Sequence, residues 1–466
     1  MLLNPEITGA AGGSLTARKI LIVSYLFPPV GGIGVQRALS MAKYLPRCGY
    51  EVHILKASTA GGPVYDSDLV RQIPAEVRVH KAFTPEIPFA IRQKLWARFL
   101  AGKSKPPPSG KPQPGGATAG RASWKKLLSG LVTRILCPEP EILWVPFALR
   151  QARRIIRRHQ IDFVLVTVPP FSALLVGTRL KQEFPRLKLI SDFRDEWLSF
   201  YLKDFEFQNN DHTRRRAEEI ERETVECSDL VVAVNHSSRT EIRRRYPDQP
   251  EHKFVVVPNG YDPEAFAGFL PRTHQLPKML VTHVGTVYKT ASPRFYLDAV
   301  DGLPEEVRQQ METRFVGRIS DSERALLENR RSRVTGLGFM PQAEALKYME
   351  DTDYLLLTMT NNISVPGKLF EYMATGKPIL AVTDPGSEVD QILRETASGL
   401  SAPPNDIEGI QGMLLRAFEA WRHRTKLVSQ AGAPVQRYER PRLAEEYSKL
   451  ILGIEGITAP VGSLGR

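Results

Sequence analysis

What this sequence lacks narrows the class of protein. It has three cysteines in 466 residues, Cys48, Cys137 and Cys227, an odd and scattered set. That pattern argues against a disulfide framework or a zinc site and favours a reducing compartment. No run approaches the about 18 consecutive apolar residues of a membrane-spanning helix. Residues 1–17 show no basic stretch followed by an apolar core, so we expect no signal peptide and a cytoplasmic protein.

Acidic residues are fewer than basic ones. The chain has 63 Lys and Arg against 51 Asp and Glu, a formal net charge of +12, which favours an anionic partner such as a nucleotide, a nucleic acid or a membrane surface. No basic strand interleaved with aromatic residues and no nucleic-acid recognition motif is present, so we do not expect nucleic acid. An apolar content of 42% and a charged content of 24% are ordinary for a soluble globular protein.

Short apolar runs alternate with helical periodicity along most of the chain, a pattern typical of buried parallel strands. The first series of predicted strands is Lys19–Tyr25, Glu51–Lys56, Asp162–Val168, Leu187–Asp192, Asp229–Val234 and Phe254–Val257. The second is Met279–Val284, Thr313–Val316, a short strand near Val334, Tyr354–Thr358 and Pro378–Thr383. The alternation predicts an α/β fold with two doubly wound domains that face a cleft.

Composition places the boundaries between these parts. We expect tails at 1–17 and 457–466, a first domain at 18–265, a second domain at 279–430 and a C-terminal helical segment at 431–456. The linker is predicted at 266–278, within a proline-containing stretch of little periodicity. Residues 103–121 are rich in proline, glycine and basic residues, which predicts a disordered insert in the first domain.

A glycine-rich loop, Pro28-Pro-Val-Gly-Gly-Ile-Gly34, follows the first predicted strand. Its glycines, Gly31, Gly32 and Gly34, let backbone approach a ligand closely, and the helix start behind them favours a phosphate or a polar substrate. The loop matches neither Walker A nor G-x-G-x-x-G. The second strand ends without the acidic residue that an NAD ribose requires. A tight turn without a ligand remains the alternative.

Ser191-Asp-Phe-Arg-Asp-Glu-Trp197 places three acids and an arginine after another strand. Ligands of parallel α/β sheets bind at that end of the strands. Asp195, with Arg194 beside it, is therefore our candidate catalytic group. A helix cap with a surface ion pair is the alternative interpretation.

The stretch from Val365 to Ala381 predicts a turn, a short helix and a buried strand. The helix start at Gly367, Lys368 and Leu369 offers free N–H groups and a positive dipole end to an anion. Glu371, one turn further in, is suited to bind the paired hydroxyls of a ribose. A surface glutamate on an ordinary strand–helix unit is the alternative.

Two further cations follow glycines at the ends of strands. Lys289 and Arg318 are suited to neutralise a diphosphate leaving group, on which negative charge develops. Each is also compatible with a solvated surface cation.

Three of these motifs together resemble those of glycosyltransferase family 4. They are Tyr25-x-Phe-Pro-Pro-x-Gly-Gly-Ile-Gly34, Val257-Pro-Asn-Gly-Tyr-Asp262 and Lys368-Leu-Phe-Glu-Tyr-Met-Ala-Thr-Gly-Lys-Pro378. The resemblance covers roughly residues 18–450 apart from the insert. It implies the GT-B fold, in which two Rossmann-like domains bring donor and acceptor together in a cleft. It also implies a retaining reaction with a UDP- or GDP-sugar as donor substrate and no bound metal or other cofactor.

The resemblance assigns roles by position. Glu371 matches the second glutamate of the family's paired-glutamate motif, which binds the donor ribose. The family has a loop that lies against the donor phosphates and the acceptor, and this loop corresponds to Gly31, Gly32 and Gly34. The groups that bind the diphosphate correspond to Lys289 and Arg318.

The chain also departs from the family pattern. Ile363 stands where the first glutamate is expected, and Thr286 stands where an arginine follows Gly285. Phe171 and Ser172 stand where many members have a histidine. These departures leave the sugar open and the general base unassigned, with Asp195 as the candidate.

A predicted helix at Phe147–Gln160 carries five arginines at i, i+3, i+4, i+7 and i+8, namely Arg150, Arg153, Arg154, Arg157 and Arg158. They are suited to bind an anionic membrane surface, at about 1 kcal/mol per basic residue. A solvated face is the alternative, since the helix's apolar positions on the neighbouring face lack aromatic anchors.

The function expected from these observations is transfer of a hexose from a nucleoside-diphosphate sugar to a hydroxyl of a glycan or a lipid-linked acceptor, in cell-surface polysaccharide synthesis. Two alternatives remain open: a sugar-nucleotide epimerase, and a non-catalytic scaffold in a polysaccharide-assembly complex.

Overall fold

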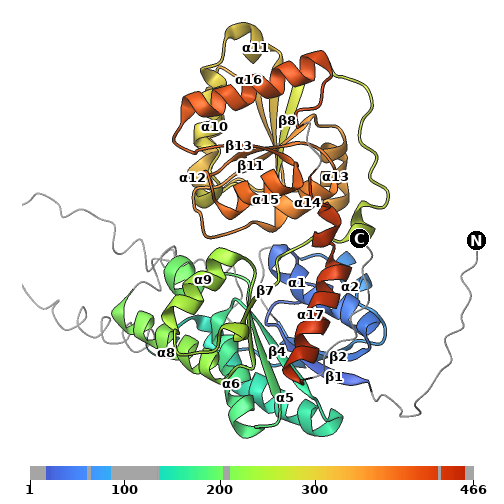
Figure 1. Ribbon diagram of the computed structural model, residues 1–466, viewed down its shortest axis with the longest axis vertical. Coiled ribbons are helices and arrows are strands. Elements are labelled where there is room, and N and C mark those ends of the chain that lie inside the picture. Colours follow the sequence, from blue (N-terminus) through green and yellow to red (C-terminus); the bar gives the residue numbers. More distant parts are fainter. Residues whose placement is uncertain are drawn as a thin grey trace, which may run out of the picture.

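The structure is a computed structural model, which describes residues 17–59, 65–85, 134, 136–202, 210–428 and 432–456. The predicted insert at 103–121, the predicted tail at 1–17 except its last residue, and the predicted tail at 457–466 lie outside the described residues. Figure 1 shows two α/β domains one above the other, with the last helix crossing from the second domain back to the first.

The first domain is a seven-stranded parallel sheet in the order β3-β2-β1-β4-β5-β6-β7. Its strands are β1 (Arg18–Val23), β2 (Tyr50–Ala57), β3 (Arg78–Ala82), β4 (Phe163–Val168), β5 (Lys188–Phe193), β6 (Leu230–Ala233) and β7 (Phe254–Val256). Its helices are α1 (Ile33–Tyr44), α2 (Asp68–Arg71), α5 (Val145–His159), α6 (Leu174–Glu183), α8 (Asp211–Cys227) and α9 (His236–Arg245). All six predicted strands are confirmed, and β3 was missed because this edge strand is largely polar and exposed.

The second domain is a six-stranded parallel sheet in the order β10-β9-β8-β11-β12-β13. Its strands are β8 (Met279–Val284), β9 (Met311–Val316), β10 (Val334–Gly338), β11 (Tyr354–Thr358), β12 (Ile379–Val382) and β13 (Gly399–Ala402). Its helices are α10 (Arg294–Asp301), α11 (Glu305–Gln309), α12 (Asp321–Arg324), α13 (Gln342–Glu350), α14 (Gly367–Ala374), α15 (Glu388–Thr396) and α16 (Ile407–His423). The short strand β13 was not predicted.

Strand order places a ligand crevice in each domain. It reverses between β1 and β4 in the first sheet and between β8 and β11 in the second. In doubly wound sheets ligands bind outside the carboxyl ends of the strands at such a reversal. The glycine loop follows β1, and the segment leading to α14 follows β11, so both motifs stand at these points.

The C-terminal helix α17 (Arg440–Ile454) packs on the first domain, although the chain reaches it from the second. Leu443, Ala444, Tyr447 and Ile451 are part of the first domain's hydrophobic core. The sequence predicted a helix here but not its packing partner, because an amphipathic face does not specify which surface it covers.

The two segments that cross between the domains lie side by side. The Tyr261 amide donates to the Tyr438 carbonyl over 3.1 Å, and the Arg440 amide donates to the Tyr261 carbonyl over 2.9 Å. A Cβ on Gly260 would lie 2.1 Å from the Tyr438 oxygen, so this position requires glycine. Part of the Val257–Asp262 motif therefore serves the domain connection.

Candidate functional site

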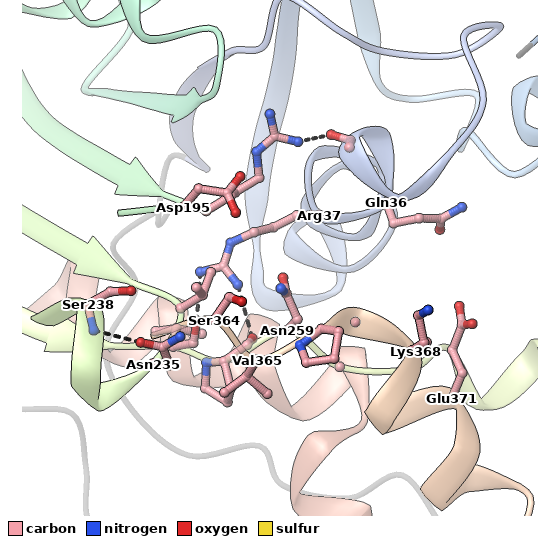
Figure 2. Close-up of a pocket in the computed structure, with 18 of the residues that line it drawn as sticks. Gln36, Arg37, Asp195, Asn235, Ser238, Asn259, Ser364, Val365, Lys368 and Glu371 are labelled. Carbon is pink, nitrogen blue, oxygen red and sulfur yellow. Dashed lines mark hydrogen bonds between the residues drawn. The ribbon is translucent and has the colours of Figure 1, made fainter. Parts of the chain in front are cut away.

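A cavity of about 540 Å³ lies between the domains, at the carboxyl ends of strands from both sheets. Clefts of roughly 300–1,000 Å³ hold ligands of drug size. The first domain contributes, among others, Leu26, Gly34, Arg37, Pro169, Arg194, Asp195 and Asn235. The second contributes, among others, Gly285, Thr286, Ile363, Ser364, Gly367, Lys368 and Glu371. Figure 2 shows several of these side chains facing one another across the cleft.

Lys368, in the first turn of α14, borders this cavity with its ammonium group 3.3 Å from Nε2 of His283. His283 Nδ1 lies 3.0 Å from the carbonyl of Leu356, to which it must donate, so Nε2 carries the lone pair and accepts from Lys368. Burial lowers the pKa of Lys368 to about 8 and holds the pKa of His283 well below its usual range. A Cβ on Gly285 would lie 3.1 Å from the Lys368 nitrogen, so glycine leaves room for this side chain.

Glu371 lies one turn further along α14, beside Lys368 (Figure 2). Burial raises the pKa of its carboxyl group, while nearby Arg440 and Lys368 act in the opposite direction. Arg440 is itself held by Gln36, to whose Oε1 it donates over 2.9 Å. Within the described part of the chain, the Glu371 carboxylate accepts no hydrogen bond, which leaves its oxygens available to a ligand.

The start of α14 also offers main-chain donors. Gly367 and Lys368 border the cavity. Leu369, which the sequence placed with them, does not: its side chain is buried in the core, and its amide donates to the Pro366 carbonyl over 3.0 Å. Leu369 therefore supports the helix from behind.

Of the three glycines in the loop after β1, Gly34 borders the cavity, whereas Gly31 and Gly32 do not. The Arg194 guanidinium holds this loop in place. It donates to the carbonyls of Gly34, Val168 and Pro169. These contacts give Arg194 a positioning role, and since it also borders the cavity, its catalytic role stays a prediction.

Asp195 borders the cavity and is half-buried. Burial raises the pKa of its carboxyl group, with the Arg194 charge opposing that rise. It forms no hydrogen bond or ion pair with another residue that the structure describes. Asp195 is thus placed as a general base would be, and that role stays a prediction.

The other acids of the 191–197 stretch are structural. Asp192 is fully buried and forms an ion pair with Arg37, 2.8 Å from Nη2 to Oδ1. The Tyr447 hydroxyl on α17 donates to the same oxygen over 2.5 Å, and Thr167 donates to the other oxygen over 2.7 Å. Glu196 accepts from two amides of the short helical turn at Trp197–Tyr201.

Arg37 was missed by sequence reasoning. Besides pairing with Asp192, it donates to the carbonyls of Val257 and Pro258, over 2.8 and 3.0 Å. It therefore joins α1, β5, the segment after β7 and α17 beneath the cavity. The only signal in the sequence is a cation among the apolar residues of a helix.

Lys289 and Arg318 do not border the cavity, and both side chains are exposed. Tyr288 and Thr290, on either side of Lys289, do border it. The phosphate-binding role of Lys289 and Arg318 stays a prediction that would require these side chains to turn toward the cleft.

Ile363, at the position of the absent first glutamate, borders the cavity. Its carbonyl accepts from the Asn235 side-chain amide of the first domain over 2.8 Å. The Asn235 side-chain oxygen accepts from the Ser238 amide over 2.7 Å and so caps α9. Asn235 was not predicted as a site residue, although it directly follows a predicted strand.

A second contact crosses the cleft nearby. The carboxylate of Glu388, at the start of α15, accepts from the amides of His236 and Ser237 in the first turn of α9, over 3.0 and 3.2 Å. A carboxylate at a helix N-terminus satisfies free donors and the helix dipole together.

Among the described residues, no helix is both long and apolar enough to cross a membrane.

Comparison with known proteins agrees with this architecture. The family model described as Glycosyltransferase Family 4 matches residues 111–265, and the model described as Glycosyl transferases group 1 matches residues 278–420. Together they cover more than half of the chain, one in each domain.

Curated relatives match over shorter stretches. A probable glycosyltransferase, WbjE of Pseudomonas aeruginosa, is 36% identical over 139 residues, 29% of this chain and 32% of that protein. AmsK of Erwinia amylovora, an amylovoran biosynthesis glycosyltransferase, is 29% identical over 105 residues, 22% of this chain and 25% of that protein. The chain thus matches a third or less of the length of each.

Solved structures are similar over nearly the whole chain. Anabaena HepE in complex with UDP and glucose aligns with a TM-score of 0.59 at 16% identity, covering 93% of this chain and 99% of that one. Sucrose-phosphate synthase from Thermosynechococcus elongatus aligns with a TM-score of 0.58 at 15% identity, covering 94% and 99%. At such identities the likeness is one of fold.

Two Rossmann-like domains around a shared cavity, with these neighbours, define the GT-B fold. Within that class, the chain belongs to the glycosyltransferases of the family 4 and group 1 type.

Proposed function

We propose that this chain transfers a hexose from a nucleoside-diphosphate sugar to a hydroxyl group of a glycan or glycolipid, with retention of configuration. The observation that carries the proposal is the arrangement of Lys368 and Glu371 in the first two turns of α14, both bordering the cavity. A cation beside free helix amides suits a diphosphate, and a carboxylate one turn away that accepts no hydrogen bond from any described residue suits the ribose hydroxyls.

The chemistry would follow from this placement. The bond between the anomeric carbon and the diphosphate oxygen breaks, and the acceptor oxygen forms the new bond to that carbon. Lys368 and the amides of Gly367 and Lys368 meet the charge that develops on the leaving diphosphate. The proton of the acceptor hydroxyl passes to Asp195, whose burial makes it a stronger base than a solvated carboxylate, or to the departing phosphate.

The acceptor is proposed from the relatives and from α5. WbjE and AmsK are described as a probable glycosyltransferase and an amylovoran biosynthesis glycosyltransferase, which supports a role in cell-surface polysaccharide synthesis. An acceptor carried on a lipid would bring this protein to the cytoplasmic face of the membrane.

The surface of α5 supports that location. Arg153 and Arg157 pair with Glu183, at 2.6 and 3.1 Å. Arg150, Arg154 and Arg158 are exposed and form no ion pair with any residue in the described ranges. These three continue the helix face of Phe147 at i+3, i+7 and i+11.

Two exposed aromatic side chains beside these arginines support the same proposal. Phe147 is 40% exposed and meets Phe83, which is 59% exposed, at 5.0 Å between ring centroids. Phe83 directly follows the carboxyl end of β3, the edge of the sheet that faces the cleft. We define the docking face as Phe83, Phe147, Arg150, Arg154 and Arg158, with apolar anchors at its cleft end and cations beyond.

Donor binding tests the proposed activity. UDP-, GDP- and ADP-sugars are titrated into the full chain, and turnover is followed with and without added glycan acceptors. We expect one donor class to bind, and Glu371→Gln to weaken its binding by about 10–100-fold, since one or two hydrogen bonds to a charged group are lost. Glu408→Gln, an exposed glutamate on α16, is the matched control.

The same assay separates the alternatives. Absence of binding to every donor, or unchanged binding by Glu371→Gln, would contradict the proposal. The non-catalytic scaffold would then be the remaining alternative. Conversion of the donor sugar without acceptor would indicate the epimerase. Since protein groups meet the phosphates in this proposal, adding Mg²⁺ should leave the rate unchanged, and a strict Mg²⁺ requirement would refute that part.

A further inference from the structure

Three histidines from separate elements meet on the first domain, away from the cleft cavity. His53 lies on β2, His80 on the edge strand β3 and His159 at the end of α5. One ring nitrogen of each lies within 4.8 Å of those of the other two. His53 is fully buried, while His80 and His159 are half-buried, so solvent reaches one side of the group. None of them borders the cavity.

Hydrogen bonds fix how the first of these rings is protonated. His53 Nε2 lies 3.0 Å from the Glu51 carboxylate and donates to it, which leaves a lone pair on Nδ1. That Nδ1 lies 3.0 Å from Nε2 of His80. A histidine that donates one nitrogen to a carboxylate and presents the other as a lone pair is the usual arrangement of a metal ligand.

The third ring is held by an arginine. His159 Nδ1 lies 3.1 Å from Arg78 Nη1 and accepts from it. Arg78 Nη1 also pairs with Glu51 at 2.9 Å, so the carboxylate offsets this positive charge beside the histidines.

From this geometry we propose that His53, His80 and His159 bind a transition-metal ion such as Zn²⁺. Zn–N bonds of about 2.0–2.1 Å place tetrahedral ligand nitrogens about 3.4 Å apart. The distance of 3.0 Å between His53 Nδ1 and His80 Nε2 is close to that spacing. A ring nitrogen of His159 lies within 4.8 Å of the other two and would move closer when the ion binds. The proton now between His53 and His80 would move to the other nitrogen of His80. The lone pair of His159 is on Nδ1, so this ring would coordinate once Arg78 gives up its contact with Nδ1 and keeps its pair with Glu51. Water occupies the fourth position on the open side.

The ion would fasten the edge strand β3 and the end of α5 to β2. Phe83 directly follows β3 and the other residues of the docking face lie on α5, so the metal would keep Phe83 beside α5. The small number of cysteines argued against a zinc site with cysteine ligands. It gives no information about a site formed by histidines that lie far apart in the chain.

The test uses the full chain without a histidine tag, freed of metal by a chelator and then dialysed. Co²⁺ is titrated while the visible d–d absorption of tetrahedral cobalt is recorded, and Zn²⁺ then competes for the site. We expect one ion per chain with micromolar or tighter binding, and a midpoint of thermal unfolding that rises with the Zn²⁺ concentration.

Variants assign the site. His80→Gln and His159→Gln should each weaken Co²⁺ binding at least tenfold and abolish the Zn²⁺-dependent shift in the unfolding midpoint. His423→Gln, an exposed histidine on α16, should leave both unchanged. His159 lies at a helix end and is half-exposed, so its variant should fold even if His80→Gln does not, which circular dichroism checks. Absence of a stoichiometric ion, or binding that survives both substitutions, would overturn the proposal and leave a hydrogen-bonded histidine cluster.

Discussion

The protonation state of Lys368 should depend on whether an anion is bound beside it. It is desolvated by burial, its ammonium group lies 3.3 Å from the neutral ring of His283, and its pKa lies near 8 although the nearby charge of Glu371 acts to raise it. A bound diphosphate would favour the charged form and raise that pKa.

Donor affinity should therefore depend on pH in one direction. Below about pH 7 Lys368 is protonated in the free protein and binding is strongest; above about pH 8 a proton must be taken up on binding, so affinity falls by up to tenfold per pH unit. Titration calorimetry from pH 6 to 9 in buffers of different ionisation enthalpy measures both the affinity and the proton uptake.

Lys368→Met isolates this effect. It should weaken donor binding by about 10–100-fold at pH 7, the value of a charge-assisted hydrogen bond, and flatten the pH dependence. Lys347→Met, an exposed lysine on α13, should behave as wild type. A pH dependence retained in Lys368→Met would show that another group titrates.

At the scale of the elements, the contact between the two crossing segments depends on Gly260. In Gly260→Ala the Cβ would lie 2.1 Å from the Tyr438 carbonyl oxygen, so the backbone must move. We expect a loss of about 1–3 kcal/mol in the free energy of unfolding, as for other overpacked sites. Urea unfolding followed by tryptophan fluorescence measures it. Gly268→Ala, where no atom of the described residues lies within 4 Å of the added carbon, should be neutral, and equal effects of the two changes would contradict this account.

The docking face is a second property of elements, since α5 carries Phe147 and the three arginines while Phe83 directly follows β3. Arg150→Gln, Arg154→Gln and Arg158→Gln together should weaken binding to vesicles of phosphatidylglycerol and phosphatidylcholine by about 100-fold, at roughly 1 kcal/mol per cation. Phe83→Ser with Phe147→Ser should weaken it by an amount that added salt does not change. Vesicle co-sedimentation measures both.

The control for these variants lies in the second domain. Arg416→Gln with Arg422→Gln on α16 removes exposed cations without touching the face. Equal binding of the wild type to neutral and anionic vesicles would contradict an electrostatic contribution.

At the scale of the whole molecule, two hydrogen-bonded contacts bridge the cleft. The Glu388 carboxylate of the second domain accepts from amides at the start of α9, and the Asn235 side chain of the first domain donates to the Ile363 carbonyl. Hydrogen bonds to a charged group contribute about 1.5–3 kcal/mol. Loss of the Glu388 contact should therefore lower the ratio of closed to open molecules about tenfold or more. Glu388→Ala should therefore enlarge the radius of gyration in small-angle scattering without donor.

Saturating donor should restore the compact form of Glu388→Ala if the nucleotide also draws the domains together. Glu408→Ala, an exposed glutamate on α16, should scatter as wild type. An unchanged radius of gyration in Glu388→Ala would show that the cleft stays closed without this contact.

The sequence by itself determined the two sheets and the start of α14. Continuous apolar runs fix buried parallel strands, because those strands bury both faces, and helix starts follow from local chemistry around Pro366 and Gly367. Every predicted strand is present, with ends displaced by at most a few residues. Lys368 and Glu371 could be placed because both lie on one short helix.

Only the tertiary structure decided which distant residues meet. Arg37, Asp192 and Tyr447 form one buried network although they lie on α1, β5 and α17, and Phe83 meets Phe147 across two elements. Arg194 was predicted beside Asp195, and only the packing shows that its guanidinium donates to backbone carbonyls. Side-chain pairing depends on the path of the whole chain, since charge and aromaticity are visible in a sequence but the partner is not.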